Sequence, residues 1–170
     1  FTLPGPMTIV DTVADAHYGS REKLAMAFAE LLNEEARALQ ADGVDVIQFD
    51  EPAYNVFMEH VPTWGIASLH RAIEGLTCTT GVHICYGYGI QANKDWKTSL
   101  GDRWTQYEAI FPALAASRID QVSLEVANSR IPDDVLGMLK GKDVLVGVID
   151  VANDAVETPE QVAETIGRAL

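Results

Sequence analysis

The apolar positions of this chain follow two alternating patterns: short continuous runs, and longer segments in which apolar residues recur every three or four positions. The second pattern is typical of an amphipathic helix and is clearest after Ser20, which can cap a helix that ends before Gly43. A last helix opens at Thr158, with Gln161 placed for a capping box. The predicted strands are 1–3, 44–50, 82–85, 121–126 and 144–150, the other predicted helices are 64–75, 104–116 and 133–139, and long loops are predicted over 53–62 and 86–101.

This alternation of strands and helices predicts an α/β fold with parallel strands joined by right-handed crossovers. A dinucleotide-binding sheet is disfavoured, because P-G-P-M-T at 4–8 stands where its G-x-G-x-x-G fingerprint would follow the first strand. Polar residues instead gather where the strands end, which is the edge at which a (β/α)8 TIM-type barrel carries its chemistry. They are Asp50, Glu51, His83, Cys85, Glu125 and Asp150.

The length of the chain limits how much of such a barrel it can form. A complete barrel needs about 250 residues, and this chain has 170. We therefore expect residues 1–170 to form one domain, a partial (β/α)8 catalytic barrel of about five parallel strands that lacks the first strands and the last strand. The chain also begins without Met and inside an apolar run, which favours a fragment.

Composition narrows the possible functions. The net charge of -13 and the pI near 4.5 argue against a nucleic-acid partner, because phosphates require a basic surface. No apolar run approaches the roughly 20 residues of a membrane helix, and no signal segment opens the chain, so no membrane partner is expected. Two cysteines make no disulfide framework, which favours the reducing cytoplasm.

His83 and Cys85 are the central candidates for chemistry. They are two residues apart on a predicted strand and so share one face, and an imidazole beside a thiol suits zinc. The alternative is a core cysteine beside a hydrogen-bonded histidine. Asp50 and Glu125 have the matching parity on neighbouring strands. Because an unpaired carboxylate is costly in an apolar strand, Glu125 either serves a function or forms a salt bridge at the barrel rim, for example with Arg130.

Five motifs together resemble the C-terminal catalytic barrel of cobalamin-independent methionine synthase and its short, single-barrel relatives. They are L-P-G-P-M-T at 3–8, Q-F-D-E-P-A at 48–53, H-I-C-Y at 83–86, S-L-E at 123–125 and G-V-I-D at 147–150. The resemblance implies a methyltransferase in which zinc activates the thiol of homocysteine and the product is methionine. It implies His83, Cys85 and Glu125 as zinc ligands and Asp50 as the anchor of the homocysteine amino group, with no catalytic residue assigned.

The resemblance also implies a fourth zinc ligand, a Cys, which we expect beyond Leu170. Cys78 precedes the strand that carries His83 and cannot take this place. Glu51, the neighbour of Asp50, should face away from the site and orient a helix or a loop.

The methyl donor is left open between a methylcorrinoid protein and methyltetrahydrofolate. The resemblance implies that folate-using enzymes carry a Trp, a Glu and a proton-donating His where this chain has Thr12, Val56 and Ala152, which favours a methylcorrinoid source. Two alternatives stay open. One is methyl transfer to another thiol, such as a mercaptoalkane sulfonate, and the other is a non-catalytic binding fragment with an incomplete metal site.

Overall fold

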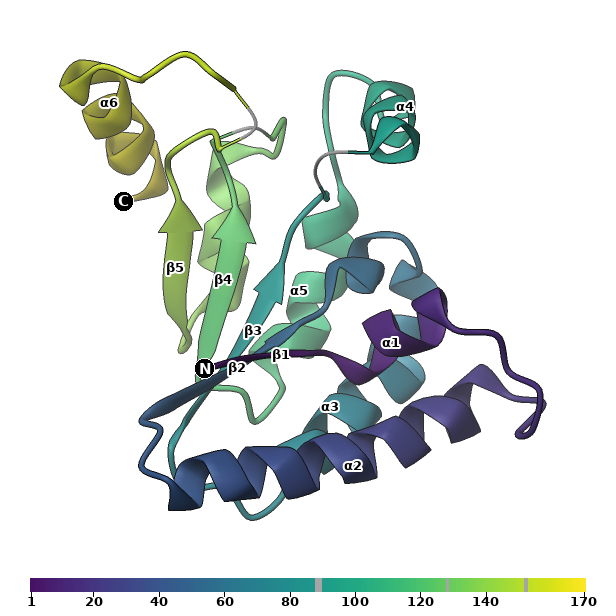
Figure 1. Cartoon of the computed structure of the whole chain (residues 1–170). Helices are drawn as coiled ribbons and strands as arrows, with labels where there is room; N and C mark the ends of the chain where they lie inside the picture. The colour runs from purple at the N-terminus through teal and green to yellow at the C-terminus, as the bar shows by residue number, and fades with distance from the viewer. Residues whose placement is uncertain (88–89, 128, 152) are drawn as a thin grey trace.

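The computed structural model describes residues 1–87, 90–127, 129–151 and 153–170, and Ala152 therefore lies outside the described residues. Within these ranges a parallel sheet carries helices along one side (Figure 1), and no helix there is long and apolar enough to span a membrane. The strands are β1 (Thr2–Pro4), β2 (Val46–Asp50), β3 (Thr79–Ile84), β4 (Gln121–Glu125) and β5 (Asp143–Gly147), and the helices are α1 (Pro6–Thr12), α2 (Arg21–Ala41), α3 (Ile66–Ala72), α4 (Gln91–Ser99), α5 (Gln106–Ala115) and α6 (Pro159–Ala169).

Strand order identifies the architecture. Each strand pairs with the next one in the sequence, in the order β1-β2-β3-β4-β5, and every pairing is parallel. Successive βα units follow one another in this way around a barrel, whereas a doubly wound sheet reverses its order at a switch point. The predicted α/β class and TIM-type barrel, represented by an arc of five strands, are confirmed.

The register of the sheet brings the predicted strand ends to one level. Asp50 of β2 lies beside His83 of β3, His83 lies beside Ser123 of β4, and Ser123 lies beside Leu145 of β5. Side chains at paired positions of neighbouring strands point to the same face. The carboxyl edge of the sheet therefore presents one row of mostly polar side chains.

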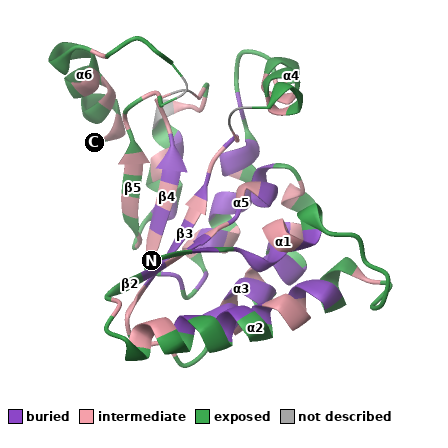
Figure 2. Cartoon of the chain, in the orientation of Figure 1, coloured by how far each residue is buried: buried purple, intermediate pink, exposed green. Residues whose placement is uncertain are grey.

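The two faces of the sheet differ in burial (Figure 2). On the face that packs against the helices, Ile47, Phe49 and Val82 have no exposed surface. On the opposite face Ser123 is half-buried and Leu145 is 46% exposed. The hydrophobic core thus lies between sheet and helices, and the inner face of the arc carries the polar row.

Two helix starts lie where the sequence predicted them. The Oγ of Ser20 accepts a hydrogen bond from the Lys23 N–H at 3.3 Å and so caps α2. Before α6, the Thr158 Oγ1 accepts a bond from the Gln161 N–H, and the Gln161 side chain accepts one from the Thr158 N–H. This completes the predicted capping box, which pairs N–H groups that the first helical turn leaves without partners.

Two helices were missed. α1 begins within P-G-P, at Pro6, because a proline is tolerated in the first helical turn, where its missing N–H is not needed. The predicted loop 86–101 is wrong over Gln91–Ser99, which forms α4. Apart from Ala92 and Trp96 the residues of α4 are polar and none is buried, so its apolar pattern is too sparse to predict a helix.

The strand that carries the His/Cys pair is longer than the predicted 82–85. β3 begins at Thr79, three residues before the predicted start, and runs through Gly81 to Ile84. Cys85 follows the strand, is half-buried and lines the groove beside the strand end. The thiol therefore lies at the mouth of the arc rather than within the sheet.

Short helical turns replace two predicted segments. The region of the predicted loop 53–62 consists of successive 3₁₀ and π-helical turns, and the predicted helix 133–139 is a 3₁₀ segment. The first region is held by the buried Tyr54, whose hydroxyl donates a hydrogen bond to the Gly65 carbonyl at 2.9 Å. These turns place a fixed wall next to the end of β2.

Candidate active site at the carboxyl edge of the sheet

The four predicted site residues lie at the same edge of the sheet. Asp50 ends β2, His83 is the penultimate residue of β3, Cys85 follows that strand, and Glu125 ends β4. The ends of β2 and β3 are joined by a hydrogen bond from the Glu51 N–H to the His83 carbonyl at 2.8 Å. The edge is thus built on paired strands, which hold side chains more rigidly than loops do.

Asp50 is half-buried and lies beside His83 of the neighbouring strand. Its Oδ1 accepts a hydrogen bond from the Gln48 Nε2 at 2.9 Å, which orients the carboxylate along the inner face. The Gly5 N–H donates to the Asp50 carbonyl at 2.7 Å and ties this strand end to the start of α1. A carboxylate held in this way can pair with a cationic group that enters the mouth of the arc.

The imidazole of His83 is oriented by Ser123. The His83 Nδ1 lies 3.0 Å from the Ser123 Oγ, a hydrogen-bond distance between side chains paired across β3 and β4. This contact leaves Nε2 as the nitrogen for a further partner. Histidines that bind metals commonly use one ring nitrogen for the metal and the other for such a contact.

Cys85 is a half-buried free thiol. Burial raises the pKa of this thiol above its ordinary value, the negative charges of Glu125 and Asp50 raise it further, and a hydrogen bond from the Gly87 N–H and the Lys97 ammonium group oppose them. The thiol is therefore protonated at neutral pH in this arrangement. A cation bound beside it would favour the thiolate.

Glu125 is buried, with 5% of its surface exposed, and both of its carboxylate oxygens are engaged. Oε2 accepts a hydrogen bond from the Tyr86 N–H at 2.7 Å, and Oε1 lies 3.0 Å from the Nζ of Lys97. The salt bridge considered for Glu125 thus exists, but its partner is Lys97 of α4 and not Arg130, which pairs with Asp102 instead.

The donor types at this edge fit zinc, which takes imidazole nitrogen, thiolate sulfur and carboxylate oxygen. In the conformation described, however, no three His, Cys, Asp or Glu side chains among the described residues are placed to hold one metal ion. The contacts of Glu125 with Lys97 and Tyr86 give a physical reason. Cys78 lies before β3, at the opposite end of the strand from Cys85, and is no substitute donor.

A groove of about 490 Å³ opens beside Cys85. Its wall combines the end of α1, the turns after β2 and the aromatic side chains of Tyr86 and Trp96, whose rings stack at 5.8 Å between centroids. Thr12 and Val56, two of the positions that bear on the methyl donor, both line it. The groove therefore connects the thiol with the region where a second substrate could approach.

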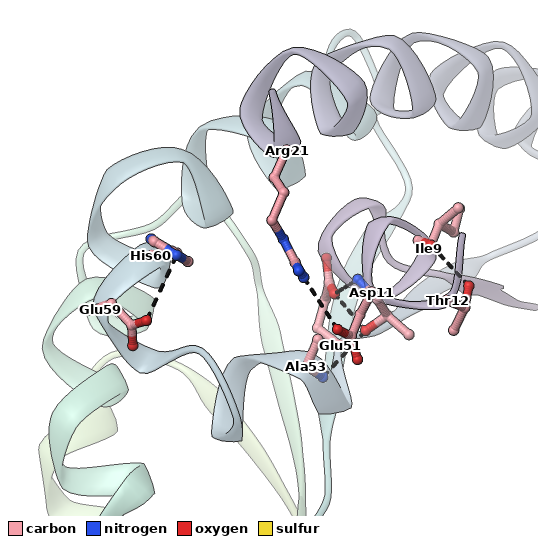
Figure 3. A network of polar contacts seen from close by, with 9 residues as sticks. Ile9, Asp11, Thr12, Arg21, Glu51, Ala53, Glu59 and His60 are labelled. Atoms are coloured by element: carbon pink, nitrogen blue, oxygen red, sulfur yellow. Dashed lines mark hydrogen bonds and ion pairs between the residues drawn. The ribbon is translucent and has the colours of Figure 1, made fainter. Parts of the chain in front are cut away.

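Glu51 faces away from this groove, as predicted, and has no exposed surface. Its carboxylate accepts hydrogen bonds from the Met7 N–H at 3.0 Å and from the Thr8 N–H and Oγ1, both at 2.8 Å. Figure 3 shows Glu51 directed at the first turn of α1, close to Ala53. Burial raises the pKa of this carboxyl to about 7 although the three bonds lower it. Glu51 thus anchors α1 beside the site.

Two residues that shape the site were not predicted to do so. Ser123 shares a face with Glu125 in the sequence pattern, but nothing in that pattern shows that its hydroxyl reaches His83. Lys97 lies in a polar segment, and its pairing with Glu125 spans 28 residues. Neither contact follows from local spacing, because both depend on which strands and helices become neighbours.

Parallel strands in barrel order, with an imidazole, a thiol and carboxylates at their carboxyl edge, define this chain as part of a TIM-type barrel with a site at its mouth. Comparison with known proteins specifies the family. Residues 2–170 match the family model described as cobalamin-independent synthase, catalytic domain, and the chain belongs to this family.

The relatives of the chain are methionine synthases. The methionine synthases of Sulfurisphaera tokodaii and Thermococcus kodakarensis are 30% and 31% identical to this chain over 99% of its length. The chain covers 44% and 45% of their own lengths. A solved B12-independent methionine synthase from Shewanella sp. W3-18-1, in complex with selenomethionine, is 61% identical, with a TM-score of 0.95 over 99% of the chain and 49% of that structure. The chain thus spans about half the length of these relatives.

Proposed function

We propose that this chain is the catalytic-barrel portion of an enzyme that transfers a methyl group to the thiol of homocysteine and forms methionine. The observation that carries the proposal is the gathering of Asp50, His83, Cys85 and Glu125 at one carboxyl edge in a chain of this family. The relatives named methionine synthase support it, and selenomethionine in the Shewanella structure is an analogue of the proposed product.

Zinc is the proposed cofactor, with His83, Cys85 and Glu125 as the residues that would hold it. When bound, zinc would supply the positive charge that keeps a thiol deprotonated and nucleophilic at neutral pH. The chain's own contribution is placement: Ser123 turns the His83 ring so that Nε2 is available, and the Tyr86 N–H fixes one oxygen of Glu125.

Asp50 is proposed to bind the amino group of homocysteine. It lies beside His83 in the register and is held by Gln48, so an ammonium group bound to it would lie near the donors for the thiol. A mercaptoalkane sulfonate would instead bring a second negative charge toward Asp50. The carboxylate therefore favours an amino-acid thiol over a sulfonate thiol.

In the transfer itself, the sulfur lone pair attacks the methyl carbon, a C–S bond forms, and the bond between donor and methyl group breaks with its electron pair leaving on the donor. The thiol proton is released to solvent before the attack. For the donor we propose a methylcorrinoid source rather than methyltetrahydrofolate. The support is that Thr12 and Val56 line the groove beside Cys85, where the resemblance places an aromatic and an acidic folate contact.

The test is methyl transfer by the full-length protein from isotope-labelled donors, with product methionine measured by mass spectrometry. Methylcobalamin with homocysteine is expected to give labelled methionine, and methyltetrahydrofolate polyglutamate little or none. Mercaptoethane sulfonate in place of homocysteine is expected to be a poor acceptor. Equal turnover with both donors would contradict the donor assignment, and no turnover with homocysteine under any donor would contradict the function.

A further inference from the structure

The ion pair between Glu125 and Lys97 occupies the carboxylate that the proposed function assigns to the metal. Both partners are largely removed from solvent, with side-chain exposures of 3% for Glu125 and 15% for Lys97. A buried carboxylate needs a cationic partner, because desolvating an unpaired charge is costly. In this structure the ammonium group of Lys97 provides that partner.

The helix that carries Lys97 packs shallowly, and its Trp96 is only partly buried against the core. None of the residues of α4 is buried, and no side chain caps its first turn. Figure 1 shows α4 standing off from the other helices beyond the carboxyl edge of the sheet, and Figure 2 shows it largely exposed. Trp96 stacks on Tyr86, and its neighbour Lys97 pairs with Glu125. α4 thus contacts the carboxyl edge through these two adjacent residues. Segments with little buried surface move at low free-energy cost.

A divalent cation bound at His83, Cys85 and Glu125 would compete with the Lys97 ammonium group for the Glu125 carboxylate. Zinc binds carboxylate oxygen at about 2.0–2.2 Å, and the Nζ of Lys97 lies 3.0 Å from the Glu125 Oε1. Two positive charges bound to one carboxylate lie close together and repel each other, and the small exposure of Glu125 weakens the screening by solvent. The ammonium group has an alternative neighbour in the Trp104 ring, whose centroid lies 5.9 Å from Nζ.

We infer that Lys97 is a positioning residue that holds Glu125 in the metal-free protein, and that a zinc ion displaces it and loosens α4. The inference rests on the proposed function, since it assumes a metal at His83, Cys85 and Glu125. Exchange of the Lys97 ammonium group for zinc would keep the Glu125 carboxylate paired with a positive charge with and without the metal. It also links occupation of the metal site to the helix that borders the groove beside Cys85.

The test compares zinc affinities of full-length variants by competition with a chelator. Lys97→Met keeps the length of the side chain and removes its charge, and it is expected to bind zinc about tenfold more tightly, equivalent to about 1.4 kcal/mol. Lys97→Arg keeps the charge and can pair through two N–H groups, so it is expected to bind zinc no more tightly than the wild type. Lys94→Met, an exposed change on the same helix, is the control and should leave the affinity unchanged.

Hydrogen exchange provides a second readout that does not depend on a measured zinc affinity. Addition of zinc to the wild type is expected to speed exchange of the amides in α4, and Lys97→Met should show fast exchange there without zinc. Zinc bound equally tightly by the wild type and Lys97→Met, with unchanged exchange in α4, would overturn the inference and leave the proposed function standing. Absence of zinc binding in both proteins would refute the metal site and the inference with it.

Discussion

Glu51 and Glu125 are both buried carboxylates at the carboxyl edge of one sheet, yet their surroundings differ in kind. Glu51 is satisfied by N–H and hydroxyl groups of α1, a helix that is itself packed into the core. Glu125 is satisfied by one backbone N–H and by a lysine from a helix without buried residues. Burial alone therefore says little about what a carboxylate does. The two differ in their partners: neutral donors of a packed helix for Glu51, and a charged lysine of an exposed helix for Glu125, which we propose as a metal ligand.

The largest difference between the two carboxylates is expected in zinc binding by the full-length protein, measured after each carboxylate is neutralised. Glu125→Gln is expected to lower zinc affinity by at least about 100-fold, since outer partners of metal ligands already account for 10–100-fold. Glu51→Gln is expected to leave zinc affinity unchanged, because Glu51 faces α1. Similar losses in both variants would mean that the two carboxylates act as one unit.

Asp50 is a third carboxylate at this edge, and its substitution separates binding of substrate from binding of metal. Asp50→Asn is nearly isosteric and can still accept the bond from Gln48, so the melting temperature and the zinc content should be kept. Loss of the charge that pairs with a desolvated ammonium group costs about 2–5 kcal/mol, or roughly thirty-fold or more in homocysteine affinity.

Calorimetric titration with two thiols checks this prediction. Affinity for a simple thiol that lacks the amino group should be unaffected by Asp50→Asn. If both thiols lose affinity equally, Asp50 shapes the metal site instead of binding the amino group. Unchanged homocysteine affinity would remove Asp50 from the site.

Much of the edge could be predicted because strand alternation is a local property. The parity of Asp50, His83 and Glu125 followed from their spacing, and it places them on the inner face of the arc. The same alternation predicted correctly that Glu51 faces away. The caps of α2 and α6 were readable for a similar reason, since each depends on residues within one helical turn.

The features that could not be predicted depend on distant neighbours or weak burial. α4 is a helix with no buried residue, so hydrophobic spacing gives no indication of it. Lys97 acquires its role only because α4 folds back over the end of β4, and Arg130, closer to Glu125 in sequence, pairs elsewhere. α1 was hidden by prolines that usually end strands but also begin helices.

The pH dependence of the free energy of unfolding is expected to reveal the buried state of Glu51. Burial raises the pKa of the folded-state carboxyl from 4.5 to about 7, so between these values the folded state binds more protons than the unfolded state. The contribution of Glu51 to the free energy of unfolding is therefore fully present below the unfolded pKa and falls as pH rises toward the folded pKa. At 1.36 kcal/mol per pKa unit, the fall is about 3 kcal/mol.

Urea unfolding of the wild type and Glu51→Gln at several pH values measures this effect. The free energy of unfolding of the wild type minus that of Glu51→Gln should fall as pH rises from about 4.5 to about 7. The other carboxylates are the same in both proteins, so their contributions cancel. A difference that instead grows with pH would show that the three hydrogen bonds from α1 outweigh burial and lower the pKa.

The smallest effect is expected from Gly5, which precedes α1 and touches Glu51. Its φ of -78° suits any residue, so the need for glycine comes from space: a Cβ at this position would overlap the Glu51 side chain. Gly5→Ala is expected to lower the free energy of unfolding by about 1–3 kcal/mol, the usual cost of overpacking. Gly167→Ala in α6 is the matched control, because a Cβ there meets no atom of another described segment within 4 Å and alanine favours the helix. Stability should rise by up to about 1 kcal/mol.

A double-mutant cycle then assigns the cause of the loss at Gly5. In a Glu51→Ala background the cost of Gly5→Ala should largely vanish, since the overlapping atoms are gone. An equal cost in both backgrounds would locate the strain in the backbone of α1 and not in its contact with the buried carboxylate.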